Sequence, residues 1–201
     1  MTGCDIVLTK WIALKGTSLI AEKKENELLK EFSGYFINIA RCFDSYLSVQ
    51  REREIAEGFG VLYTCETGEG GIYKALWEMG EELGVGFEVE LKAIPVKQET
   101  IEISNFFDID PYKLLSGGSL LLVTEKGHDL SHIMQKNGIN AAVIGKTNDT
   151  KDRVILNDSI RRFICPRDKD EIGVILSEAK DLYRKDQHGQ KRKTHQNSKG
   201  H

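Results

Sequence analysis

The stretch YTCETGEGGIYKALWEMGEELGVG, residues 63–86, reads as the end of a strand, a glycine-rich loop and an amphipathic helix. Apolar residues in its second half recur at i, i+3, i+4 and i+7, the spacing of a helix that packs on one side. These residues are Ile72, Ala75, Leu76, Met79 and Leu83. A strand followed by such a helix is a unit of a layered domain built from a sheet and helices.

The loop between them holds Gly68, Gly70 and Gly71, with the carboxylates Glu66 and Glu69 among them. Glycines before a helix expose backbone N–H groups, and the helix dipole favours anions at that end. We therefore predict that Gly68, Gly70 and Gly71 bind a phosphate-bearing ligand, or that Glu66 holds a metal. The alternative is a tight turn with positive φ that lets helix and sheet pack closely.

Downstream, the alternation of apolar and acidic residues in 87–91 predicts a strand with one wet face. The apolar run 120–123 predicts a central strand that is buried on both faces. Further expected elements are helices at 95–106, 111–115, 127–137 and 168–185, a strand at 139–146, and a hairpin of 152–156 with 160–164 around Asn157 and Asp158.

Upstream, DIVLT at 5–9 predicts a strand, and Gly16-Thr17-Ser18 offers N-cap chemistry for a helix that runs to about Phe32. Expected next are a helix at 35–47, a polar helix or connection at 48–58 and a strand at 59–64. The order predicts a layered α/β (α+β) domain with a mixed β-sheet and helices packed on it.

Composition and charge limit the class of protein. The chain has 201 residues, 40% of them hydrophobic, which suits one globular domain or two small ones. The net charge of −3 divides into +5 for residues 184–201 and −8 for residues 1–183. Nucleic acid is therefore not an expected partner of residues 1–183. The basic tail has no apolar residue after Tyr183, so we expect it to be disordered.

Other patterns concern location and reactivity. No segment approaches the ~18 apolar residues of a membrane span, and the N-terminal residues lack a signal-peptide pattern, so we expect a cytoplasmic protein. The four cysteines form no CxxC, which fits a reducing compartment. Cys65 near the glycine loop is either a nucleophile or a small buried hydrophobe.

Three weaker candidates remain. Gly16-Thr17-Ser18 is a second possible anion nest, with a plain N-cap as its alternative. Ser116-Gly117-Gly118-Ser119 is a third, for which close backbone approach is an equal explanation. His128 and His132 have the i, i+4 spacing of metal ligands, but no third ligand with suitable spacing is visible.

Four segments together carry a family resemblance: DIVLTKWIALKGTSLIA at 5–21, ETGEGGIYKALWEMGEELGVGFEVEL at 66–91, IPVKQETIEISNFFDIDPYKLLSGGSLLL at 94–122 and AAVIGKTNDTKDRVILND at 141–158. In this order they resemble the C-terminal domain of the aminoimidazole ribonucleotide (AIR) synthetase, or PurM-like, superfamily. The branch they most resemble contains proteins related to hydrogenase expression/formation factor E.

The resemblance implies a PurM C-terminal-like domain over residues 1–183, without the N-terminal ATP-binding domain, followed by the tail at 184–201. Members bind ATP and Mg²⁺, phosphorylate an oxygen or amide, and work as dimers. The implied function is the C-terminal half of an ATP-dependent protein that contributes to nucleotide or substrate binding and dimerisation, and we do not expect it to be active alone. The alternative is a non-catalytic, stand-alone binding or dimerisation module.

The resemblance also bears on the site. It implies nucleotide binding at Glu66, Gly68, Gly70 and Gly71, with Glu66 on the metal. The family usually has Asp where this chain has Glu66 and Thr where it has Gly68, so the carboxylate is kept and the hydroxyl is lost. The implied partners are a second copy or an N-terminal domain, and a small-molecule substrate. The hydrogenase factor uses a C-terminal cysteine as the thiol that carries the modified group, and this chain has no cysteine near His201.

Overall fold

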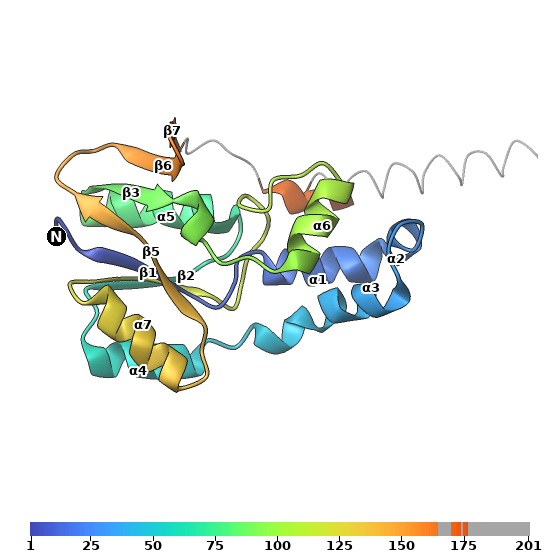
Figure 1. Cartoon of the computed structure of the whole chain (residues 1–201), viewed down its shortest axis with the longest axis horizontal. Coiled ribbons are helices and arrows are strands. Elements are labelled where there is room, and N and C mark those ends of the chain that lie inside the picture. The colour runs from blue at the N-terminus through green and yellow to red at the C-terminus, as the bar shows by residue number, and fades with distance from the viewer. Residues whose placement is uncertain (165–169, 174, 177–201) are drawn as a thin grey trace, which may run out of the picture.

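The computed structural model describes residues 1–164, 170–173 and 175–176. Its centre is a seven-stranded sheet in the order β2-β4-β1-β5-β3-β6-β7 (Figure 1). The strands are β1 (Asp5–Thr9), β2 (Tyr63–Glu66), β3 (Gly86–Glu90), β4 (Leu120–Thr124), β5 (Ala141–Asn148), β6 (Arg153–Asn157) and β7 (Ile160–Phe163). All neighbouring pairs are antiparallel except β3 with β6, so the predicted mixed sheet is confirmed.

The helices lie on both faces of the sheet and beyond one end of it (Figure 1). They are α1 (Leu14–Lys23), α2 (Glu25–Leu28), α3 (Gly34–Arg41), α4 (Gln50–Phe59), α5 (Gly71–Leu83), α6 (Gln98–Phe106) and α7 (Gly127–Lys136), with 3₁₀ turns η1 (Cys42–Tyr46) and η2 (Leu91–Ala93). In Figure 1, α4 and α7 cover the lower face and α5 the upper one, while α1, α3 and α6 extend to the right.

The alternation of side chains along β1 divides the core in two. Ile6 and Leu8 face the larger cluster, which α5 covers with Ile72, Leu76 and Met79. Val7 faces the smaller cluster, to which α4 and α7 contribute. Because both faces of the sheet are covered, β1 and β4 are buried at every residue, as the apolar run in β4 predicts.

The predicted start of the first helix is wrong. The helix begins at Leu14, after Ala13 in the left-handed conformation with φ 58°, and no side chain caps it. Thr17 and Ser18 lie inside the helix, where the Thr17 hydroxyl donates to the Ala13 carbonyl and the Ser18 hydroxyl donates to the Arg41 carbonyl. Their polarity serves buried hydrogen bonds and not an N-cap.

Other predicted elements also differ from the structure. The residues before Gly60 belong to α4, which Gly60 ends with φ 78°, so β2 starts only at Tyr63. The predicted helix at 111–115 is a set of turns, because the Asp110 carboxylate accepts the Tyr112 amide two residues on. The helix expected at 95–106 begins at Gln98.

Some expectations fall outside the described part of the chain. Of the helix predicted at 168–185, residues 171–173 and 175–176 are described and are helical. The tail at 184–201 lies wholly outside the described residues. Within the described part, no helix is both long enough and apolar enough to cross a membrane.

Candidate functional site

The structure brings together the three glycine-rich stretches that the sequence treats separately. The Ser116 amide donates to the Gly68 carbonyl at 2.9 Å, and the Gly16 amide donates to the Leu115 carbonyl at 2.9 Å. The Thr67 amide donates to the Ser119 carbonyl at 3.0 Å. We call residues 13–18, 66–71 and 115–119 the glycine cluster; it lies where β2 and β4 meet the first turns of α1 and α5.

Close backbone approach explains some of these glycines. A Cβ at Gly71 would clash with the Tyr112 carbonyl, and one at Gly118 would lie 2.6 Å from the Tyr46 carbonyl. Both residues also have positive φ, so the packing interpretation accounts for them. Gly68 is different, because a Cβ there would meet nothing within 4 Å. The open side of the cluster is therefore at Gly68.

The backbone amides of the cluster differ in what they already bind. The Gly70 amide donates to the Asp170 carboxylate at 2.7 Å, and the Gly71 amide donates to the Gly68 carbonyl at 3.2 Å. In contrast, no acceptor among the described residues takes the amide of Gly68, Glu69 or Gly117. Of the three glycines that the sequence suggests, only Gly68 therefore has an amide available to an anion among the described residues, while the amides of Gly70 and Gly71 are already taken.

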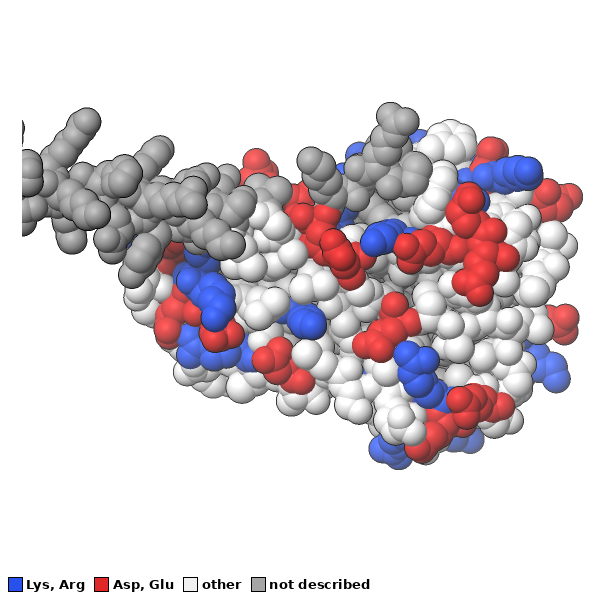
Figure 2. All heavy atoms as spheres, turned by 180° about the vertical axis from the view of Figure 1, so that it is seen from behind, with Lys and Arg blue, Asp and Glu red and all other residues white. Residues whose placement is uncertain are grey.

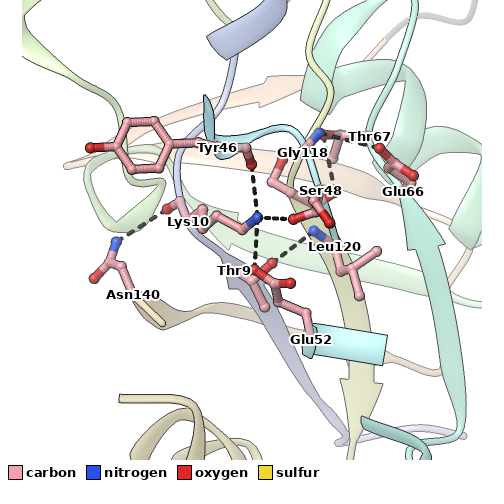
Figure 3. A network of polar contacts seen from close by, with 11 residues as sticks. Thr9, Lys10, Tyr46, Ser48, Glu52, Glu66, Thr67, Gly118, Leu120 and Asn140 are labelled. Atoms are coloured by element: carbon pink, nitrogen blue, oxygen red, sulfur yellow. Dashed lines mark hydrogen bonds and ion pairs between the residues drawn. The ribbon is translucent and has the colours of Figure 1, made fainter. Parts of the chain in front are cut away.

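Glu66 braces the two loops of the cluster against each other. One carboxylate oxygen accepts the Gly118 amide at 3.2 Å (Figure 3), and the other lies 3.3 Å from an Arg53 nitrogen. The side chain is 39% exposed, so it is open to a ligand on one side. Beneath it, the buried hydroxyls of Thr67 and Ser119 share a 2.5 Å hydrogen bond.

A buried ion pair supports the cluster from below. The Lys10 ammonium donates to the carbonyls of Tyr46 at 2.8 Å and Ser48 at 2.6 Å, and it pairs with Glu52 at 2.7 Å (Figure 3). The Tyr46 carbonyl is the atom against which Gly118 packs. With all three contacts in place, Lys10 acts as a structural anchor for the cluster and offers no free amine.

Two further lysines flank the cluster. Lys15 has its side chain against Gly117, and the side chain of Lys74 lies against Gly70. Lys15 is exposed and the Lys74 side chain is 48% exposed, so both ammonium groups can reach solvent. Neither lysine is among the residues predicted from the sequence, although Lys15 directly precedes a glycine motif and Lys74 falls in the first turn of the helix that follows another.

The residues present do not form a complete metal site. Among the described residues, no group of three or more His, Cys, Asp or Glu side chains could hold a metal ion. This applies to His128 and His132, and it also applies to Glu66, whose two oxygens already contact Gly118 and Arg53. Hard cations such as Mg²⁺ need several oxygen ligands. A magnesium ion therefore does not fit this part of the chain without ligands from elsewhere.

Cys65 behaves as the small hydrophobe of the two alternatives. It packs against the larger core cluster, and burial raises the pKa of its thiol. Its neighbour Tyr63 also has a raised pKa, chiefly through burial. A thiol with a raised pKa is a poor nucleophile near neutral pH, because little thiolate forms.

The described residues on one face of the molecule show no sign of nucleic-acid binding. Figure 2 shows acidic and basic side chains interspersed among the described residues of the face behind the view of Figure 1. That face has no continuous basic area of the kind that follows a phosphate backbone.

The fold and the glycine cluster together define a class of protein, which a family model identifies. Residues 2–157 match the family described as AIR synthase related protein, C-terminal domain. The chain belongs to this family, and the predicted PurM-like superfamily is confirmed. β7 and Asp170 lie beyond the matched residues.

Relatives and solved structures agree with this assignment. The chain is 33% identical over 130 residues to the phosphoribosylformylglycinamidine synthase subunit PurL of Caldanaerobacter subterraneus subsp. tengcongensis, over 62% of this chain and 17% of the relative. E. coli HypE, a hydrogenase maturation protein, has a TM-score of 0.71 at 15% identity, covering 85% of this chain and 52% of HypE.

A HypE structure in complex with ATP has a TM-score of 0.66 at 13% identity, over 86% of this chain and 53% of that one. At these identities the likeness establishes the fold. The chain spans about half the length of the HypE structures and about a sixth of PurL.

Proposed function

We propose that this chain is the C-terminal half of an ATP-dependent protein of the hydrogenase-maturation type, and that its glycine cluster forms one wall of a nucleotide or substrate site. The observation that carries the proposal is the convergence of three distant glycine stretches on a set of open backbone amides. The likeness to a HypE structure that contains ATP supports the choice of a nucleotide.

The chemistry of the cluster suits a phosphate group. The open amides of Gly68, Glu69 and Gly117 would donate hydrogen bonds to its oxygens, as backbone amides do in other anion nests. The ammonium groups of Lys15 and Lys74 would supply the compensating positive charge. Gly71, whose amide is already used, shapes the loop, and Gly70 becomes available only if Asp170 leaves.

Glu66 is the residue of this chain that we propose faces Mg²⁺. Because one carboxylate is not enough, the remaining ligands would come from the nucleotide and from another domain or chain. The same incompleteness leads us to propose that the chain works with an N-terminal-domain partner or as a homodimer. We also propose a cytoplasmic location and no turnover of ATP by this chain alone.

A second candidate is a non-catalytic binding or dimerisation module. One observation favours it: the Gly70 and Gly71 amides at the start of α5, which the sequence assigns to a phosphate, already have acceptors within the chain.

Calorimetric titration of the full chain with Mg-ATP, followed by an ATPase assay on the same sample, separates the two. We expect binding without turnover, and no binding would favour the non-catalytic module. Glu66→Ala should weaken Mg-ATP binding, whereas Glu69→Ala, on the same loop, should not. Equal affinities of the two variants would remove Glu66 from the site. Turnover by the unmodified chain would contradict the half-enzyme proposal.

A further inference from the structure

A carboxylate that lies beyond the residues matched by the family model reaches into the glycine cluster. One oxygen of Asp170 accepts the Gly70 amide at 2.7 Å. The other accepts the Leu115 amide at 3.1 Å and the Ile172 amide at 2.8 Å. Gly70 and Leu115 are far from Asp170 in sequence and belong to two different loops of the cluster. The side chain therefore joins three backbone amides around one negative charge.

The residues that follow hold this carboxylate in place. We call the described residues 170–173 and 175–176 the latch. Ile175 is only 3% exposed and belongs to the larger core cluster, and Ile172 packs against the same cluster. The Glu171 amide adds a long hydrogen bond of 3.5 Å to the Lys113 carbonyl. The latch is thus docked by a few apolar contacts and by the Asp170 carboxylate.

Capping its own helix does not require these contacts. A helix N-cap needs one oxygen for one amide of the first turn, which the bond to Ile172 supplies. The additional hydrogen bonds to the Gly70 and Leu115 amides place the negative charge of the Asp170 carboxylate at the N-terminus of α5, a helix of 13 residues. A phosphate group favours this same position, for the same reasons of dipole and amide donors.

We propose that the latch is autoinhibitory: Asp170 takes the place of one phosphate group at the glycine cluster, and its release opens the amides of Gly70 and Leu115 to a phosphate-bearing ligand. This inference rests on the proposed function of the cluster. A phosphate and the Asp170 carboxylate compete for the Gly70 amide, and their like charges repel. Binding of one therefore disfavours the other.

The test compares Mg-ATP binding by the full chain with binding by Asp170→Asn, using calorimetry. Asparagine keeps an acceptor for the Ile172 amide and is a good N-cap, but it removes the charge and one of the two acceptor oxygens. If the latch is closed in about nine molecules of ten or more, its loss tightens the apparent affinity about tenfold or more. Asp149→Asn is the control, because it removes one exposed carboxylate outside the cluster.

A second variant shows whether any gain in affinity comes from release of the latch or only from the changed side chain at position 170. Ile175→Ala leaves Asp170 intact and weakens only the apolar docking, so it should also tighten Mg-ATP binding. Circular dichroism and thermal unfolding establish that each variant is folded.

The outcomes separate the two proposals. Tighter binding by Asp170→Asn and Ile175→Ala, with Asp149→Asn unchanged, supports the latch. Equal or weaker binding by the two latch variants overturns it and leaves the nucleotide site standing, as does an equal gain in the Asp149→Asn control. Absence of binding in the unmodified chain and in all variants overturns the nucleotide site itself, and the latch with it.

Discussion

Replacing Lys10 with methionine should remove a large share of the stability of the domain. The Lys10 side chain is 10% exposed and that of its partner Glu52 is 4% exposed, so the ion pair is buried. The substitution leaves the Glu52 carboxylate buried without a counter-charge. It also leaves the carbonyls of Tyr46 and Ser48 without their donor. Breaking a buried pair from one side typically costs about 3–5 kcal/mol.

A matched control comes from an exposed ion pair. Lys92 pairs with Asp158 at 2.6 Å, a bond as short as that of Lys10, but the two side chains are 69% and 71% exposed. Exposed ion pairs contribute about 0–1 kcal/mol, so Lys92→Met should change the free energy of unfolding by about 1 kcal/mol or less. Burial, and not bond length, then accounts for the difference between the two variants.

The measurement is urea-induced unfolding followed by tryptophan fluorescence, with Trp11 and Trp77 as the two reporters. The free energy of unfolding should fall by about 3–5 kcal/mol in Lys10→Met, which is a large part of the 5–15 kcal/mol of a typical domain. A fall of less than about 1 kcal/mol would refute the reasoning. It would mean that the Glu52 carboxylate reaches water when Lys10 is gone.

Three more predictions concern the glycine cluster and the thiols. Gly71→Ala should destabilise the domain by about 2 kcal/mol or more because its Cβ clashes and its φ is positive, whereas Gly68→Ala should be nearly neutral in thermal unfolding. Alkylation read by mass spectrometry should label the exposed Cys42 before Cys65. Because burial raises the pKa of the Cys65 thiol in the folded state, the thiol contributes to stability below about pH 8.5, and this contribution is lost as the pH rises through the folded-state pKa. Lys74→Ala should weaken Mg-ATP binding several-fold in calorimetry and reduce its dependence on salt, and unchanged binding would remove this lysine from the site.

Much of the fold can be predicted because its signals are local. The apolar stripe of Ile72, Leu76 and Met79 predicts α5, and the run in β4 predicts a strand buried on both faces. The start of α1 could not be predicted, because Thr17 and Ser18 look like caps to any local rule. Their partners, Thr100 and the Arg41 carbonyl, are 83 and 23 residues away.

In the candidate site, too, the local features could be predicted from the sequence and the long-range contacts could not. Each glycine stretch is visible in the sequence, but nothing local indicates that the Gly68 loop bonds to Ser116 or that Gly118 packs on Tyr46. The contact from Asp170 to Gly70 spans 100 residues and involves a common surface residue type, so no pattern marks it. The partners of a loop depend on the topology of the sheet, which periodicity does not specify.

The position of β1 has a consequence for how the chain is made. This strand lies between β4 and β5, and its pairing partners in β4 come more than 110 residues later. At ribosomal rates of about 5–20 residues per second, β1 leaves the ribosome roughly 6–25 s before its first neighbour exists. Its five residues, all buried in the finished sheet, are exposed during that interval. The nascent chain is therefore most prone to aggregate before residue 120 is synthesised, and a chaperone that binds apolar segments would act in this period.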